Sequence, residues 1–143
     1  MKTPTTIVYN TQVIASSGRD GKVESNDGRL SIALSLPKEM GGEDNPSGTN
    51  PEQLFAAGYA ACFLSAIKFV ASSDNKTISE EASITSSVGI GPTEGGFALA
   101  VELNISLPGM NKDEAETLVS KAHQVCPYSN ATRGNVEVKL SIA

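Results

Sequence analysis

The sequence predicts a single α+β domain over residues 1–143. In this domain, largely antiparallel sheets pack on a long buried central helix and a second helix. Three observations lead to this class. Strand-like and helix-like stretches follow the order β-β-β-α-β-β-α-β instead of alternating as βαβ units. No charged residue occurs from Leu54 to Ile67, which is typical of a helix buried on all sides. The composition, 39% hydrophobic and 19% charged, is that of an ordinary globular protein.

Three strand patterns precede the central helix. Residues 6–16 are rich in β-branched and aromatic types, and residues 22–25 form a short second strand. Residues 30–36 alternate between apolar and small side chains, as a half-buried strand does. The tight-turn signal Asn26-Asp27-Gly28 joins the last two strands. We therefore expect a three-stranded antiparallel meander.

A 13-residue loop over 37–49, rich in Pro, Gly, Asn and Asp, leads into the central helix at Asn50. Loops of this length in a compact domain are often functional. Asn50 is a suitable N-cap and Pro51 suits the first helical position. A membrane span needs roughly 20 apolar residues, whereas Lys68 interrupts this stretch. We expect a core helix that ends near Ser72.

The second half of the chain predicts a hairpin, a helix and a last strand. Residues 80–91 and 97–107 form the hairpin, the second of them with strict alternation. Residues 111–126 carry a single apolar helical stripe behind an Asn-x-x-Glu capping signal. We expect a loop over 129–135 and a final strand, at the edge or in the core, over 136–142.

Charge and cysteine content narrow the class of function. The net charge of -5, without basic clusters, argues against nucleic acid and against an anionic membrane surface as partners. No apolar signal region precedes the first strand, so we expect a cytoplasmic protein. Permanent disulfides are rare there, so two cysteines suggest a redox or catalytic use. The absence of a Cys-x-x-Cys pair excludes the thioredoxin motif and most zinc sites, and one histidine with two cysteines cannot make an ordinary structural zinc site without carboxylates.

The two cysteines lie on different helices. Cys62 is near the middle of the central helix, and Cys126 ends the second helix on its apolar stripe, where Pro127 stops it. Both thiols therefore face the interior and can meet, although sequence alone does not place them within disulfide distance. The alternative, a small-ligand binding or sensing module with inert core cysteines, stays open.

A reactive thiol needs a lowered pKa, and neither cysteine lies at a helix N-terminus. Burial raises the pKa of Cys62, so a cation must come from elsewhere in the fold. Glu52 suits the helix N-terminus by itself, and it could also orient an arginine through a bidentate pair. The loop residue Arg19 is either that arginine or a solvated turn residue. The candidate cations are Arg19, Arg29, Lys68, His123 and Arg133.

Two segments resemble a known family. The sequence G-T-N-P-E-Q-L-F-A-A-G-Y-A-A-C-F at Gly48–Phe63 and A-H-Q-V-C-P-Y-S-N-A-T-R-G-N at Ala122–Asn135 are similar to the two cysteine motifs of the organic hydroperoxide resistance family. The early G-R-D-G at Gly18–Gly21 is also similar. This family is a branch of the superfamily that includes the osmotically inducible OsmC proteins. The second motif resembles the hydroperoxide branch, and the osmotic branch is the rival.

The resemblance implies an antioxidant thiol peroxidase that reduces organic hydroperoxides, including those of fatty acids, to alcohols. Cys62 matches the peroxidatic cysteine, which would become a sulfenic acid, and Cys126 matches the resolving cysteine of a Cys62–Cys126 disulfide. Arg19 matches the activating arginine and Glu52 the acid that holds it. Aromatic residues of the central helix are candidates for an apolar substrate lining: Phe55, Tyr59, Phe63 and Phe69.

The resemblance also implies partners. Members of the family are intertwined homodimers with active sites at the subunit interface. They are recycled by dihydrolipoyl groups on a lipoylated protein, so the expected reductant is an external lipoyl dithiol. Neither a metal nor a bound organic cofactor is implied.

One inference comes from spacing alone. Glu52 and Cys62 are ten residues apart on one helix, or about 15 Å along its axis. One arginine is too short to pair with Glu52 and reach Cys62 of the same helix. We therefore expect a composite site in a dimer, with Glu52 from one chain and both cysteines from the other, and Arg19 from either.

Overall fold

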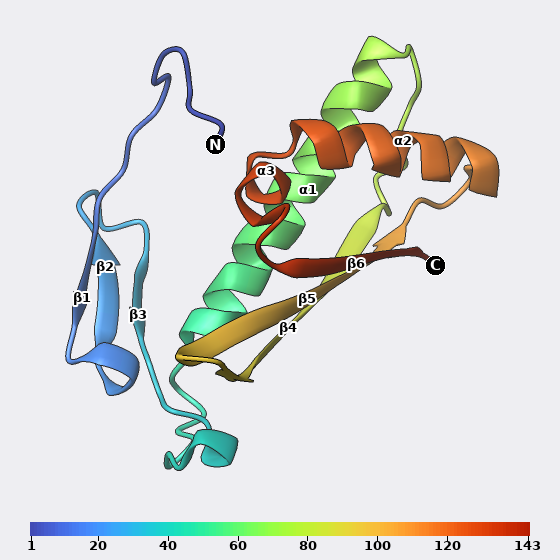
Figure 1. Ribbon diagram of the computed structural model, residues 1–143. Helices are drawn as coiled ribbons and strands as arrows, with labels where there is room; N and C mark the ends of the chain where they lie inside the picture. The colour runs from blue at the N-terminus through green and yellow to red at the C-terminus, as the bar shows by residue number, and fades with distance from the viewer. The chain divides into compact units, whose positions relative to one another are not determined.

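The α+β class is confirmed in the computed structural model, which describes residues 1–143 (Figure 1). The chain forms two compact units, Met1–Leu54 and Phe55–Ala143, and one domain over 1–143 stays a prediction. Each unit contains one three-stranded sheet. The elements are β1 (Val13–Ser16), β2 (Lys22–Ser25), β3 (Ser31–Ala33), α1 (Pro51–Ser73), β4 (Ser83–Thr93), β5 (Gly96–Ser106), α2 (Lys112–Val125), α3 (Pro127–Thr132) and β6 (Glu137–Ile142), with short 3-10 turns at Gly18–Asp20 and Lys38–Met40.

The first unit contains the predicted antiparallel meander, in the order β1-β2-β3. The strand predicted over 6–16 is wrong for residues 6–12, since β1 begins at Val13. Val13 pairs with Ser25, the last residue of β2, so residues before it run past the turn and have no strand to pair with. The carbonyl of Gln12 adds one backbone hydrogen bond, accepting the N–H of Asn26 at 3.0 Å.

The predicted loop over 37–49 returns to the end of β3. The N–H of Ser35 donates to the carbonyl of Thr49 at 2.8 Å, and the N–H of Thr49 donates to the carbonyl of Ala33 at 2.9 Å. Ser35 Oγ also accepts the N–H of Asn45 at 2.8 Å. These bonds fix the residue before Asn50, and thereby the start of α1.

The predicted cap of α1 is confirmed, because Asn50 Oδ1 accepts the N–H of Gln53 at 2.8 Å. The Gln53 side chain does not complete a capping box. Its Oε1 accepts a hydrogen bond from the Thr49 hydroxyl at 2.6 Å instead. The loop before the helix is therefore tied to its first turn by side chains.

Burial of α1 on all sides, as its apolar sequence predicts, is wrong for the single chain. The face of α1 that is turned away from the core carries small residues and Phe69, which is 65% exposed. The helix is apolar all round, but one chain covers only one face of it. By length and composition alone α1 could cross a membrane, a test that a core helix also passes. Six residues are buried: Tyr59, Phe63, Ala66, Ile67, Val70 and Ala71.

The second unit contains the sheet β4-β5-β6 and the main core. The hairpin β4–β5 pairs antiparallel from Ser83↔Ser106 to Thr93↔Gly96, as its alternation predicts. β6 is an edge strand parallel to β5, with Val138 opposite Val101. Apolar residues of α1, β5 and α2 share one core, which includes the buried Cys126.

The end of α2 differs from the prediction. Asn111 caps α2 as expected, its Oδ1 accepting the N–H of Glu114 at 2.9 Å. Pro127 stops α2, but it also begins α3, so the loop predicted over 129–135 is wrong for its first four residues. Proline lacks an N–H that the first turn would leave unpaired, and its fixed φ suits the first helical position.

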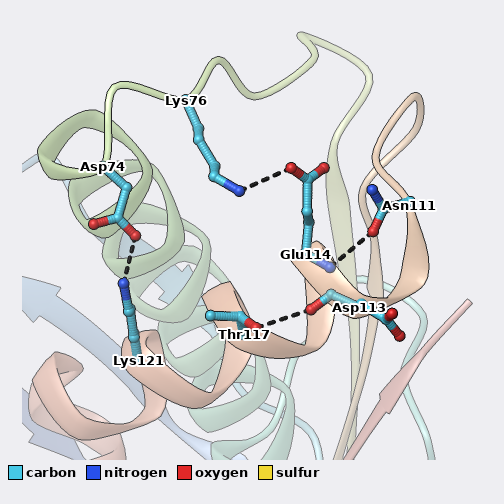
Figure 2. A network of polar contacts seen from close by, with 7 residues as sticks. All are labelled: Asp74, Lys76, Asn111, Asp113, Glu114, Thr117 and Lys121. Atoms are coloured by element: carbon cyan, nitrogen blue, oxygen red, sulfur yellow. Dashed lines mark hydrogen bonds and ion pairs between the residues drawn. The ribbon is translucent and has the colours of Figure 1, made fainter.

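Two ion pairs connect the segment after α1 with α2 (Figure 2). Lys76 Nζ lies 2.9 Å from Glu114 Oε1, and Lys121 Nζ lies 2.6 Å from Asp74 Oδ2. Each segment thus supplies one acid and one lysine. The two pairs fix α2 along α1, and Cys126 follows directly after α2.

Candidate active site

The structure brings the two cysteine thiols together. Cys126 Sγ lies 3.8 Å from Cys62 Sγ, and both cysteines are free. Cys62 is half-buried on α1, and Cys126 is fully buried at the junction of α2 and α3. The site is a dithiol at the edge of the core, within reach of a disulfide after a small approach of the sulfur atoms.

The surroundings of Cys62 act on its pKa in opposite directions. Burial raises the pKa of the Cys62 thiol above its ordinary value, and the nearby Cys126 adds to the rise because two adjacent thiolates repel. The backbone N–H of Tyr128 donates to the Cys62 sulfur and lowers the pKa. The net direction is upward, so an additional positive group is needed to make Cys62 a ready nucleophile.

The Tyr128 amide belongs to α3, which our sequence reasoning missed. Cys126 is the last residue before that helix, and Tyr128 lies in its first turn. The expectation that neither thiol meets a helix start was wrong in this respect. The available signal was Pro127, which marks a helix start as well as a stop.

A buried polar network lies beside the dithiol. Tyr59 Oη is 2.8 Å from Ser129 Oγ and 3.3 Å from Thr132 Oγ1. Ser129 Oγ is also 2.8 Å from His123 Nδ1. Burial and the charge of Arg133 lower the pKa of His123 below its ordinary value, so it is mainly neutral at pH 7. His123 is therefore not the cation that Cys62 needs.

The other candidate cations differ in their surroundings. Arg133 donates to the backbone carbonyl of His123 and to Asn130 Oδ1, so it holds α3 against the end of α2. Lys68 is exposed, and the Arg29 side chain is 90% exposed beside Asp27. None of these three is placed by its contacts at the sulfur atoms.

Arg19 forms a bidentate pair with Glu52 in the first unit. Arg19 Nη1 and Nη2 lie 2.8 Å from the two carboxylate oxygens of Glu52. Arg19 holds the pKa of Glu52 below its ordinary value, and Glu52 raises that of Arg19. Ser17 and Gly18, at φ 60° and 64°, turn the chain so that the short 3-10 turn presents Arg19. The fork of the guanidinium is thereby fixed in orientation.

The four predicted residues thus form two pairs, Arg19–Glu52 in the first unit and Cys62–Cys126 in the second. Sequence reasoning missed Gly58, Tyr128, Ser129 and Thr132 around the dithiol. A glycine inside a long helix was the signal for Gly58, because it costs helix stability and often marks close packing. The hydroxyl residues of α3 gave no signal, because they were expected to lie in a loop.

The fold and the site define an α+β protein with a partly buried dithiol, one thiol of which is on the long central helix. The family model described as OsmC-like protein matches residues 42–141. The organic hydroperoxide resistance protein of Xanthomonas axonopodis pv. citri is 55% identical over 143 residues, which is 100% of both chains. OhrB of Bacillus subtilis is 42% identical over 135 residues, 94% of this chain and 98% of OhrB.

Solved structures agree with this. The crystal structure of an organic hydroperoxide resistance protein from Legionella pneumophila has a TM-score of 0.91 at 52% identity, covering 96% of this chain and 99% of that one. That of Bacillus subtilis OhrB has a TM-score of 0.86 at 41% identity, covering 96% and 100%. The chain belongs to the OsmC-like family, in its organic hydroperoxide resistance branch.

Proposed function

We propose that this protein is a thiol-dependent peroxidase that reduces organic hydroperoxides, including those of fatty acids, to alcohols. The observation that carries the proposal is the 3.8 Å approach of Cys62 and Cys126 as free thiols. The names of the relatives, organic hydroperoxide resistance proteins, support the substrate class.

The chemistry requires two thiols in sequence. The Cys62 thiolate attacks the distal oxygen of the hydroperoxide, the O–O bond breaks, and the alkoxide leaves as alcohol after taking a proton. Cys62 is then a sulfenic acid. The Cys126 sulfur attacks the Cys62 sulfur and water leaves, which gives a disulfide with a bond of about 2.05 Å. From 3.8 Å the sulfur atoms approach by about 1.8 Å.

An external dihydrolipoyl group on a lipoylated protein reduces the disulfide by two thiol exchanges and becomes a lipoyl disulfide. The reaction thus returns both protein thiols and needs no bound cofactor. The apolar contacts of Cys62 suit an alkyl peroxide. Tyr59 and Phe63 are buried in the core cluster against which Cys62 packs, and Phe55 is half-buried, whereas Phe69 is exposed in the single chain.

Arg19 and Glu52 are proposed as the activating pair. The guanidinium lowers the pKa of Cys62 and favours its thiolate, while Glu52 holds the fork in place. Glu52 and Cys62 lie on α1 about 15 Å apart along its axis. The proposed site is therefore composite in an intertwined homodimer, each chain giving its cysteines to one site and its Arg19–Glu52 pair to the other. The exposed apolar face of α1 suits such a partner.

The test is a thiol count before and after one equivalent of cumene hydroperoxide. We expect the loss of two thiols per chain in the wild type and no loss in Cys62→Ser. With lipoyl reductant, turnover should favour cumene hydroperoxide over hydrogen peroxide. Unchanged thiols in the wild type would show that the cysteines are inert and that the protein is not a thiol peroxidase.

A further inference from the structure

Gly58, on α1, leaves space for the ring of Tyr128, which belongs to α3. A Cβ atom at Gly58 would lie 2.7 Å from Tyr128 Oη and 3.2 Å from Cε2 and Cζ. Real Cβ atoms do not come this close to other heavy atoms, so any larger residue at position 58 must displace the ring. Glycine inside a helix destabilises that helix relative to alanine. The close approach of Tyr128 is a physical reason for its presence.

Two other aromatic rings contact the ring of Tyr128. The centroid of its ring lies 6.2 Å from that of Phe55, edge-on, and 5.7 Å from that of Tyr59. Phe55, Gly58 and Tyr59 lie within one turn of α1, and we call these three residues the Tyr128 seat. The two rings flank Tyr128 on two sides, and Tyr128 is 38% exposed, so a methyl group at position 58 has to displace the ring away from α1.

The same turn of α1 also holds α3 through hydroxyl groups. Tyr59 Oη is 2.8 Å from Ser129 Oγ and 3.3 Å from Thr132 Oγ1, and all three residues are buried. α3 is therefore attached to α1 on two sides, by the Tyr128 ring and by these hydroxyl groups. A six-residue helix has little stability of its own, so its position depends on these contacts.

The position of α3 sets the position of Cys126. Cys126 immediately precedes α3, two residues before Tyr128. Gly58 lies four residues, about one helical turn, before Cys62 on α1. Cys126 thus meets Cys62 one turn along α1 from the place where Tyr128 is seated. A shift of the ring moves the Cys126–Tyr128 segment relative to Cys62, together with the Tyr128 amide that donates to the Cys62 sulfur.

We propose that Gly58 is a positioning residue, whose bare backbone seats the Tyr128 ring and thereby fixes the approach of Cys126 to Cys62. In turnover this would set the rate at which the resolving thiol attacks, a consequence that rests on the proposed function. The approach itself is a property of the dithiol and needs no peroxide to be measured.

The experiment therefore uses a general dithiol oxidant. Diamide takes two electrons and two protons from Cys62 and Cys126, giving a disulfide and the reduced hydrazine. We expect Gly58→Ala to form this disulfide about tenfold more slowly than the wild type, because an ångström-scale misplacement of reacting atoms can cost that much or more. The rate is followed by loss of free thiols and by mobility on a non-reducing gel.

A rescue variant separates positioning from a general loss of structure. The atom nearest to the added methyl group is the Tyr128 hydroxyl oxygen. Gly58→Ala with Tyr128→Phe should therefore recover at least half of the lost rate, with Tyr128→Phe alone as its reference. A double variant that is no faster than Gly58→Ala would overturn the proposal, as would a wild-type rate in Gly58→Ala.

Thermal unfolding checks that each variant is folded. If Gly58→Ala does not fold, Tyr128→Ala empties the seat without inserting an atom and should slow disulfide formation by a similar factor; a wild-type rate there also overturns the proposal. The two proposals fail differently. A wild type that is oxidised by diamide but not by cumene hydroperoxide contradicts the peroxidase, while the comparison of Gly58→Ala with the wild type in diamide still decides the role of Gly58.

Discussion

Cys126 Sγ lies 3.8 Å from Cys62 Sγ although 64 positions separate the two residues in the sequence. Neither α1, which carries Cys62, nor α2, which Cys126 follows, brings the two sulfur atoms together by itself. α1 and α2 share the core, the two ion pairs after α1 fix α2 along it, and α3 returns the chain to α1 immediately after Cys126. The sulfur contact is thus a consequence of how three helices pack. It is also what distinguishes a dithiol site from two separate core cysteines.

The first prediction separates the two cysteines by role. In Cys126→Ser, Cys62 can still react with an alkyl hydroperoxide, but no thiol is present to resolve the sulfenic acid. We expect one equivalent of peroxide to be consumed, a sulfenic acid that dimedone labels at Cys62, and loss of turnover with lipoyl reductant. The measurement is intact mass after dimedone treatment. A disulfide-linked product or continued turnover in this variant would contradict the assignment of Cys126.

The second prediction concerns the pH dependence of the Arg19–Glu52 pair. Arg19 lowers the pKa of Glu52 from its ordinary 4.5 in the folded protein. The pair therefore stabilises the fold fully above about pH 4.5, and this contribution is lost as the pH falls through the lower, folded-state pKa. Glu52→Gln should reduce the free energy of unfolding by about 1 kcal/mol at pH 7, since Arg19 is partly exposed.

The variant and the wild type should converge in acid, because a protonated Glu52 is then as neutral as glutamine. Chemical denaturation at pH 7 and near pH 3 measures the difference at both ends. Glu24→Gln is the matched control, since Glu24 pairs with Lys22 on the surface and should have a smaller effect at pH 7. A Glu52→Gln difference that is equal at both pH values would show that the carboxylate charge is not the stabilising feature.

The third prediction tests the composite site by mixing two inactive chains. One chain carries Arg19→Ala with Glu52→Ala, and the other carries Cys62→Ser. If the sites are shared across a dimer, a mixed dimer has one site with intact cysteines from the first chain and an intact arginine–glutamate pair from the second. Random assortment then gives about a quarter of the wild-type peroxidase activity. The chains are mixed under mild denaturant and refolded together, with each chain refolded alone as control.

Activity in the mixture supports the shared site, because sites built within one chain would each lack a part. No recovery in a mixture that native mass spectrometry shows to contain mixed dimers would rule out the composite arrangement. A protein that stays monomeric in the same measurement would contradict the homodimer itself.

The sequence predicted those parts of the fold that depend on neighbouring residues. The alternation over 97–107 and the caps at Asn50 and Asn111 are local patterns, and the structure confirms them. The parallel pairing of β6 with β5 depends on the whole topology and could not be predicted from a strand pattern. Pro127 was interpreted only as a helix stop, so α3 was missed.

In the candidate site, too, the sequence predicted what depends on local pattern and not what depends on packing between elements. The apolar positions of both cysteines predicted that they face the interior, but their distance depends on the packing of separate helices. The exposed face of α1 could not be foreseen from composition, because burial depends on what covers a helix and not only on its own residues. The Tyr128 seat needs the close approach of two helices, of which Gly58 was the only local trace.

The last prediction concerns the ion pairs in Figure 2, which fix α2 along α1. Asp74→Lys places two lysines opposite each other and should lower the free energy of unfolding by about 1 kcal/mol at low salt. The reversed pair, Asp74→Lys with Lys121→Asp, restores the attraction and should recover most of that loss. In 1 M NaCl the difference should shrink, because the Debye length falls to about 3 Å.

Lys112→Ala is the control, as the Lys112–Glu116 pair lies within α2 and is more exposed. Equal stability of the single and the reversed variant at low salt would show that the Asp74–Lys121 contact does not hold the two helices together.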